Sequence, residues 1–413
     1  MKERKSWQQK TQFKKRMKTF KYLLAIIPAF IFGGAISAQT TLEKVLENVE
    51  RNNLTLEAQR HGTEAKTLEA RMGNSLEELS VSYDHLWGKP VDEFGKTGEF
   101  NVSQSFDFPT VYSNRSKVAG NLARQYGNEF VALRQQILLE AKQAYIELLY
   151  ASRVQEMLEY RVKSCKKLAG LYTERFESGD ASLLEKTKMN HEYLIAEEEA
   201  AANRMTIVEL QRKLISLNGG LDIGFDSVAD MPMEELPPVG SAQEDYRNLY
   251  PALQAYRLQS EGAKYNLKLS RSMALPKFEV GYKYEYATAG ERFNGVTMGL
   301  SIPIFTNKYN VKRAKAAQQS IELEAKAAEV DCDLMVEEMY RKASLLRSAL
   351  TAYDEVEHGN SYVELLGVAL EAGQLSVVEY FSEIYSYYDV VNSKLRLELQ
   401  YKLLAAEINS IYL

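Results

Sequence analysis

The chain has 413 residues, of which 45% are hydrophobic and 26% are charged, and its formal net charge is −5. An acidic chain is a poor candidate for binding nucleic acid, because phosphates are held by basic surfaces. It contains only 9 Pro and 23 Gly, and this scarcity favours long uninterrupted elements over a loop-rich enzyme fold.

The N-terminal segment has the layout of a secretory signal. Basic residues within 14–21 precede an apolar run over 22–36, and small residues follow at 37–39. The apolar run is shorter than about 20 residues and contains Pro28, which argues against a transmembrane anchor. We therefore predict that residues 1–38 are a signal peptide and that the rest of the chain is exported.

The segment 39–218 is predicted to form a first structural repeat. Thr41 can cap a short amphipathic helix, and a second helical pattern follows over about 54–72. Apolar and polar residues then alternate over about 79–87 and again over about 100–108. Alternation with period two predicts strands, and two such strands joined by a polar loop predict a β-hairpin.

A long helical pattern follows the hairpin and ends at a predicted turn. It runs without Pro from about 113 to 176, which at about 1.5 Å per residue gives a helix about 95 Å long. Gly179 then stops the helix, Ser182 stands three residues later, and Glu185 three residues after that. This spacing predicts a left-handed helix stop and a capping box, so the tip of a helical hairpin lies at Gly179. The returning helix is predicted over 182–217.

A linker over 219–249, which contains Pro232, Pro237 and Pro238, separates this repeat from a second one over 250–413. Alternating patterns over about 278–287 and 296–305 predict a second β-hairpin. A long helical pattern follows over about 310–372.

The turn at Gly179 occurs a second time about half a chain later. Gly373 ends the second long helical pattern, Ser376 follows after three residues, and Glu379 after three more. The tip of a second helical hairpin is therefore predicted at Gly373, followed by a helix over about 376–410. Two copies of one tip at this separation predict that the protein is internally duplicated.

Each predicted strand has one apolar and one polar face. Such a strand fits between lipid and a wet lumen, and it also fits a soluble β-sandwich. The number of strands favours the membrane, because two distant hairpins have no further strands with which to form a sandwich. Four strands cannot close a barrel and open edges are not tolerated in lipid, so other copies of the chain must supply the rest, and three copies would give twelve strands. The residues expected to face the membrane are Phe106, Phe108, Phe278, Tyr282, Tyr284, Leu300 and Ile302.

The repeated order of helix, strand, strand, long helix, Gly tip and helix resembles the outer membrane efflux protein family, the TolC-like exit ducts. Ser-Phe-Asp-Phe-Pro at 105–109 and Leu-Ser-Ile-Pro-Ile-Phe at 300–305 resemble the ends of the family's second strands, and both Gly tips resemble its periplasmic tips. The fold class implied by the resemblance is an internally duplicated α+β membrane protein. Its long helical hairpins form an α-helical barrel, and its four transmembrane β-strands per chain complete a trimeric 12-stranded β-barrel.

The function implied by the resemblance is that of an outer-membrane exit duct of a tripartite efflux or type I secretion system. The duct is a passive homotrimeric channel in outer-membrane lipid, and its periplasmic helical domain docks to a periplasmic adaptor protein and an inner-membrane pump of the RND type. The alternative is a periplasmic coiled-coil scaffold or adaptor without channel activity. The implied docking residues at the tips are Arg175, Gly179, Ser182, Gly373 and Ser376, and the implied candidates for an aperture constriction are Glu379, Ser382 and Glu383.

The sequence offers no catalytic constellation. His191 and Glu192 begin a zinc-protease pattern, but Ile195 stands where the second His must be. The acidic run at 197–199 is predicted to be a solvated helix face, and the two cysteines, on apolar positions of helical patterns, are predicted to be buried. We therefore predict a protein that is not an enzyme and that has no cofactor, no metal site and no nucleic-acid partner.

Overall fold

The structure is a computed structural model that describes residues 41–413 apart from 89–94, 225–230, 288–289, 304–306 and 355–360. The predicted signal peptide, residues 1–38, lies outside the described residues. None of the described helices carries an apolar run long enough to cross a bilayer.

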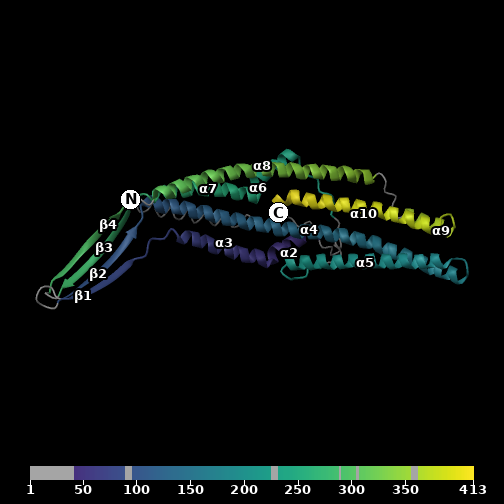
Figure 1. Cartoon of the computed structure of the whole chain (residues 1–413), viewed down its shortest axis with the longest axis horizontal. Helices are drawn as coiled ribbons and strands as arrows, with labels where there is room; N and C mark the ends of the chain where they lie inside the picture. The colour runs from purple at the N-terminus through teal and green to yellow at the C-terminus, as the bar shows by residue number, and fades with distance from the viewer. Residues whose placement is uncertain (1–40, 89–94, 225–230, 288–289, 304–306, 355–360) are drawn as a thin grey trace, which may run out of the picture. The chain divides into compact units, whose positions relative to one another are not determined.

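The described elements fall into two repeats with the same order (Figure 1). The first repeat consists of α2 (Leu42–Asn52), α3 (Leu54–Met72), β1 (Ser80–Gly88), β2 (Gly95–Phe106), α4 (Pro109–Glu177) and α5 (Leu183–Leu217). The second consists of α6 (Val239–Leu249), α7 (Pro251–Ser272), β3 (Lys277–Ala287), β4 (Arg292–Ser301), α8 (Asn307–Asp354), α9 (Ser361–Glu371) and α10 (Val377–Ile408), followed by the short 3₁₀ helix η2 (Asn409–Tyr412).

The second repeat contains a helix that the sequence analysis missed. α6 lies within the segment predicted to be a linker, and with 11 residues it is as long as α2. One residue separates α2 from α3, and one residue likewise separates α6 from α7. The prolines at 237–238 favoured a linker, but Pro238 stands at the N-cap of α6, where a missing N–H costs nothing. The duplication is therefore more complete than predicted.

The long helix of the first repeat is continuous. α4 has 69 residues and begins at Pro109, a few residues earlier than predicted, because Pro is well suited to the first helical turn. At about 1.5 Å per residue it is about 100 Å long. In the second repeat, α8 and α9 occupy most of the long helix predicted over 310–372, and residues 355–360 of that prediction lie outside the described residues.

The four strands form one antiparallel sheet in the order β1-β2-β3-β4. The two hairpins are joined through β2 and β3, which come from different repeats and pair from Thr97 opposite Ala287 to Phe106 opposite Phe278. Residues directly opposite one another in a sheet lie on the same face, so the register places the apolar sides of all four strands together.

Two strand ends differ from the prediction. β2 starts at Gly95 and ends at Phe106, so Phe108 lies outside the sheet and precedes the first residue of α4. β4 starts at Arg292 and ends at Ser301, so Ile302 also lies just beyond its strand. Both differences have one cause, since a proline follows each of these two residues and cannot donate a hydrogen bond to the ladder.

Short helices cover the long ones in end-to-end pairs. α3 and α5 both pack along α4, while α7 and α10 both pack along α4 and α8. Buried apolar clusters lie between them: Val45, Val49, Tyr145 and Leu214 at the joint of the first pair, and Tyr246, Leu253, Val336 and Ile408 at the joint of the second.

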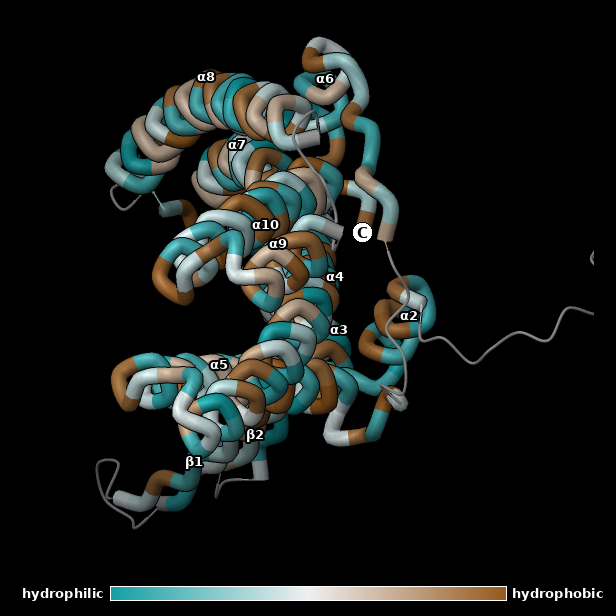
Figure 2. Tube along the Cα trace, turned by 90° about the vertical axis from the view of Figure 1, so that its right-hand side faces the viewer, coloured by the Kyte–Doolittle hydropathy of each residue, from teal (hydrophilic) through white to brown (hydrophobic). Residues whose placement is uncertain are grey.

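Apolar side chains also occur where no described helix covers them. α5 and α8 both carry hydrophobic residues along their exposed sides, which appear as brown segments on these helices in Figure 2. They include Leu194, Met205 and Val208 on α5 and Leu323, Leu334 and Leu345 on α8.

The centre of the sheet depends on a glycine. A Cβ atom at Gly281 would lie 2.5 Å from Oγ1 of Thr297 and 2.9 Å from the carbonyl oxygen of Val102, so the two neighbouring strands would have to move. We expect Gly281→Val to destabilise the sheet by about 1–3 kcal/mol, measured as a lower melting temperature of the β-sheet circular dichroism signal. Gly295→Val is the matched control, because no atom lies within 4 Å of a Cβ at that position. Equal melting of the two variants would contradict the packing seen around Gly281.

Candidate functional site

The first hairpin tip ends α4 with a Schellman-type turn. Gly179 has φ = +84°, in the left-handed region that favours glycine. The N–H of Asp180 donates to the carbonyl of Arg175 at 2.7 Å, and the N–H of Gly179 donates to the carbonyl of Phe176 at 3.2 Å. These two bonds satisfy the last carbonyls of the helix and reverse the chain within a few residues.

A complete capping box starts α5 directly after this turn. The N–H of Ser182 donates to the Glu185 carboxylate at 2.8 Å, and the N–H of Glu185 donates to Oγ of Ser182 at 3.2 Å. The bond from the Ser182 backbone is the main cause of a lowered pKa of Glu185. Because the folded-state pKa is lowered, the stabilisation is present above the ordinary carboxyl pKa and is lost as the pH falls through the lowered value.

The second tip repeats these bonds. Gly373 has φ = +71°, and the N–H of Gln374 donates to the carbonyl of Ala369 at 2.8 Å. Ser376 and Glu379 form the second capping box, with the same two distances of 2.8 and 3.2 Å. The predicted turns and capping boxes are therefore present at both tips, and their role in docking stays a prediction.

The two tips differ in their side chains. The Arg175 guanidinium of the first tip lies 5.3 Å from the centre of the Tyr172 ring, whereas Ala369 stands at its place in the second tip. Leu183, at the start of α5, is 64% exposed, whereas the equivalent Val377 of α10 is only 7% exposed. The tips thus differ at this position: the first exposes Leu183, while the second packs Val377 into the apolar cluster with α4 and α5 residues.

The predicted aperture residues share one side of α10. Glu379, Ser382 and Glu383 are three and four residues apart and all are exposed, as expected for one helix face. Both carboxylates have partners within the chain: Glu379 belongs to the capping box, and Glu383 accepts a hydrogen bond from the Tyr362 hydroxyl of α9 at 3.0 Å. The bond to Glu383 is the main cause of a raised pKa of Tyr362. An aperture role for this face stays a prediction.

A buried polar network behind the tips was missed by the sequence analysis. Arg161 of α4 is only 7% exposed and forms an ion pair with Glu199 of α5. Its guanidinium carbon lies 5.1 Å from the centre of the Tyr385 ring of α10, and the Tyr385 hydroxyl donates to Glu192 of α5. The network therefore connects α10 to both helices of the first hairpin.

This network refines one prediction. The acidic run at 197–199 was expected to be a solvated face, and Glu198 is exposed, but the partly exposed Glu199 pairs with the buried Arg161. The signal that could have revealed the pair is Arg161 itself, which interrupts the apolar series of α4 close to Leu158 and Cys165. Burial, followed by the hydrogen bond to Glu192, raises the pKa of Tyr385 to about 12, so its hydroxyl stays protonated and able to donate at neutral pH.

We expect Arg161→Met to destabilise the helical part by about 1.5–3 kcal/mol, because it removes the buried guanidinium that pairs with Glu199 and lies against the Tyr385 ring. The change is measured as a lower melting temperature of the helical circular dichroism signal. Lys167→Met is the matched control: Lys167 lies on the same helix and pairs with Glu371, but its side chain is 74% exposed, so its loss should cost less than about 1 kcal/mol. Similar decreases in melting temperature for both variants would show that the Arg161 pair stabilises the helical part no more than an exposed ion pair does.

The sheet presents one apolar and one polar face. On the polar face, Lys283 of β3 pairs with Glu99 of β2 at 2.8 Å. The register aligns the predicted membrane-facing residues of β2, β3 and β4 on the opposite face, with Val81 and Tyr83 of β1 beside them. The predicted residues that lie on this apolar face within the strands are Phe106, Phe278, Tyr282, Tyr284 and Leu300.

The described part of the chain contains no group of three or more His, Cys, Asp or Glu side chains arranged to hold a metal ion. Cys165 and Cys332 are both buried and unpaired, as predicted. Burial raises the pKa of Cys165 to about 11, which keeps its thiol protonated and unreactive.

No protein-family model matches the sequence. Among curated proteins, the chain is 25% identical over 295 residues to the outer membrane protein TolC of Vibrio cholerae. The match covers 65% of this chain and 65% of that protein, slightly less than two thirds of its length.

The fold is similar to those of solved outer-membrane channels. The structure of the CmeC channel of Campylobacter jejuni matches with a TM-score of 0.72 and 14% identity over 90% of this chain and 85% of that one. The structure of VceC of Vibrio cholerae matches with a TM-score of 0.70 and 16% identity over 90% and 95%. A membrane protein of Pseudomonas aeruginosa matches with a TM-score of 0.73 and 15% identity over 90% and 89%.

These comparisons confirm the predicted resemblance to TolC-like outer membrane factors and, with it, the predicted location in the outer membrane. The CmeC structure is that of an outer membrane channel. The similarity to these solved structures extends over about 90% of this chain, which combines long helices with one four-stranded antiparallel sheet.

Proposed function

We propose that this chain, a TolC-like outer membrane factor by sequence resemblance and fold, is the exit duct of a tripartite efflux or type I secretion system. The observation that carries the proposal is the four-stranded sheet with one largely apolar face, attached to long helical hairpins with two matching tips. A passive duct needs these two parts, one to line a hole in a membrane and one to reach a partner.

The sheet supports the membrane part of the proposal. Its apolar face includes side chains as exposed as Met298, at 83%, and Val296, at 68%, and an exposed surface of this kind requires an apolar partner. Within the described residues, β1 and β4 pair on one side only, so the sheet has two open edges. Lipid does not tolerate open edges, so copies of the chain must pair edge to edge. Three copies make a 12-stranded barrel, the even strand number usual for such barrels.

The helices support the same assembly. The exposed apolar sides of α5 and α8, such as Leu194 and Leu334, lie on two different helices, each available to a neighbouring copy. In a closed ring, α8 of one copy packs against α5 of the next and removes both apolar sides from water. The homotrimer thereby forms an α-helical barrel continuous with the β-barrel.

The tips support docking to partners. The exposed backbone around Gly179 and Gly373 and the exposed Leu183 and Leu184 of the first tip offer a surface for a periplasmic adaptor protein. The adaptor connects the duct to an inner-membrane pump of the RND type, which supplies the energy. Arg175, Ser182 and Ser376 lie within the same surface. A periplasmic scaffold without channel activity would explain the helices but not the apolar face of the sheet.

The assembly is tested by extraction from membranes. We expect the protein to resist a high-salt wash, to require detergent for release, and to run as a particle about three times the mass of one chain. In planar bilayers the purified particle should conduct ions. A protein that leaves the membrane with salt, or a stable monomer that keeps its full strand content, would refute the duct.

The tips are tested by substitution of their glycines. A β-branched residue strains the left-handed conformation of Gly373, so Gly373→Val should distort the docking surface and reduce efflux by at least about tenfold while trimer yield stays the same. Gly367→Val is the matched control, because Gly367 lies within α9 and no atom lies within 4 Å of a Cβ there. The same pair of changes at Gly179 and Gly170 repeats the test on the first tip. Normal efflux by the tip variants would show that the tips are turns with no role in docking.

The aperture is tested by comparing the two capping-box glutamates. Three copies of Glu379 at a narrow end would form an acidic ring that attracts cations and binds divalent ions. We expect Glu379→Gln to lower cation selectivity and relieve divalent block in single-channel recordings. Glu185→Gln removes the same cap at the other tip and should change conductance much less. If both variants only lower thermal stability, Glu379 is a cap and the aperture lies elsewhere.

A further inference from the structure

The joint between α7 and α10 contains a cavity that the proposed duct does not use. The two helices follow one another along α8 and α4, and a cavity of about 290 Å³ lies where they meet. Such a volume is near the lower end of the range for small-molecule sites. Among the residues that line it, those able to recognise a ligand by charge or polarisable surface are Tyr246, Tyr250, Met335, Met339 and Glu407.

The equivalent joint of the first repeat is filled by amide side chains. There Asn53 donates from Nδ2 to the carbonyl of Leu217 at 2.8 Å, and Asn52 donates to Oδ1 of Asn218 at 2.9 Å. In the second repeat Tyr250 occupies the place of Asn53, as the C-cap of α6 and the N-cap of α7, and its side chain makes no capping bond. The cavity is therefore not an unavoidable result of stacking two helices end to end.

Two tyrosine rings and a carboxylate converge on the cavity. The ring centres of Tyr246 and Tyr250 are 5.6 Å apart, with their planes inclined by 44°. Tyr246 is buried and held in place, because its hydroxyl lies 3.1 Å from the carbonyls of both Glu407 and Ile408. Tyr250 is half-buried, and the pKa of Tyr250 is raised mainly by burial, with smaller contributions from Cys332 and the nearby carboxylate of Glu407.

We propose that this cavity binds a small organic monocation with a quaternary or tertiary ammonium group. The half-buried ring of Tyr250, against which Tyr246 packs, attracts such a cation, and the Glu407 carboxylate adds a direct charge interaction. The thioethers of Met335 and Met339 supply a polarisable, adaptable surface for its apolar groups. Among the described residues that line the cavity, Glu407 is the one carboxylate and none is Lys, Arg or His, so the lining favours a cation over an anion.

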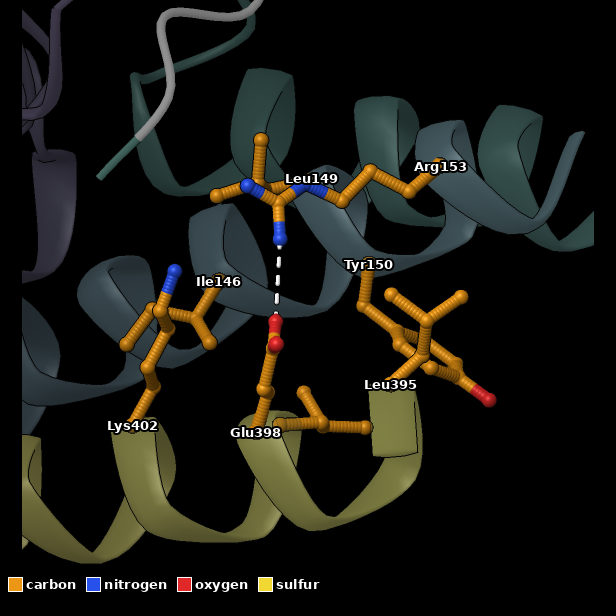
Figure 3. Close-up of a pocket in the computed structure, with 8 residues that line it drawn as sticks. Ile146, Leu149, Tyr150, Arg153, Leu395, Glu398 and Lys402 are labelled. Carbon is orange, nitrogen blue, oxygen red and sulfur yellow. Dashed lines mark hydrogen bonds and ion pairs between the residues drawn. The ribbon is translucent and has the colours of Figure 1, made fainter. Parts of the chain in front are cut away.

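A second pocket on α10 contains a carboxylate that already has a cationic partner within the chain. It lies between α4 and α10 and has a volume of about 10 Å³, enough for about one water molecule. Its carboxylate, Glu398, accepts a hydrogen bond from Arg153 at 3.0 Å, shown as the dashed line in Figure 3. Apolar side chains of Ile146, Leu149 and Leu395 crowd around this pair (Figure 3). Glu398 therefore provides a control carboxylate on the same helix as Glu407.

The proposal is tested by isothermal titration calorimetry, in which phenyltrimethylammonium is titrated into the purified full-length protein in detergent. The neutral isostere tert-butylbenzene is titrated in parallel. We expect the wild type to bind the cation at least about tenfold more tightly than the neutral isostere, and we expect Glu407→Gln to weaken cation binding at least about tenfold. Tyr250→Leu, which removes one ring but keeps an apolar side chain, should weaken binding by a similar factor.

Glu398→Gln should bind the cation like the wild type, since its carboxylate is occupied by Arg153. If Glu398→Gln and Glu407→Gln lower the affinity for the cation equally, binding depends only on the total charge of α10, and the proposed site is overturned. Wild-type affinity in Glu407→Gln, equal binding of the neutral isostere, or no heat of binding at millimolar cation would overturn it as well. Because Glu407 is exposed, Glu407→Gln retains the fold and gives a result even if Tyr250→Leu does not fold.

Discussion

The structure depends on covering the apolar stripe of one very long helix. α4 has 69 residues, and no other described helix is long enough to cover it alone. Two shorter helices must therefore follow one another along each covered side, α3 with α5 and α7 with α10. Most of the stabilisation of such helices comes from this packing rather than from their intrinsic propensity. The position of each joint is set by the lengths of the helices that meet there.

A joint between two stacked helices exposes backbone groups that need partners. The last carbonyls of one helix and the first N–H groups of the next come together there, and each costs free energy if it is buried unpaired. The first repeat solves this with Asn53, which accepts from the N–H of Leu56 and donates to the carbonyl of Leu217. The second repeat places Pro251 at the start of α7, which removes one N–H, and uses the Tyr246 hydroxyl to reach the carbonyls of α10. The two repeats thus pair the backbone groups at equivalent joints with different side chains, and only the arrangement in the second repeat leaves the cavity described above.

Local chemistry made the turns predictable and the strand ends only approximately so. Gly179 and Ser182 determine a helix stop and a helix start within a few residues, so their spacing in the sequence was sufficient to place the first tip. Strand alternation likewise identified all four strands and their apolar sides. Where β2 and β4 end depends on the partner strand and on the prolines that follow, which displaced Phe108 and Ile302 from the sheet. The Arg161 network could not be predicted in the same way, because Glu192 and Tyr385 are about 190 residues apart and meet only through tertiary packing.

The duplicated tips separate what the backbone requires from what the side chains add. Both tips use a left-handed glycine and a Ser-Glu capping box, so these residues build the turn in each tip and do not distinguish one tip from the other. A partner that distinguishes the tips must contact positions at which they differ. Arg175 of the first tip has no charged counterpart on the second, and Leu183 has no exposed one. The same reasoning applies to Glu379. Its carboxylate is already used by the N–H of Ser376, and this bond is the main cause of its lowered pKa, which keeps the carboxylate ionised. A cap and a charged ring are therefore compatible in one residue, since the bond that fixes the side chain also maintains its negative charge.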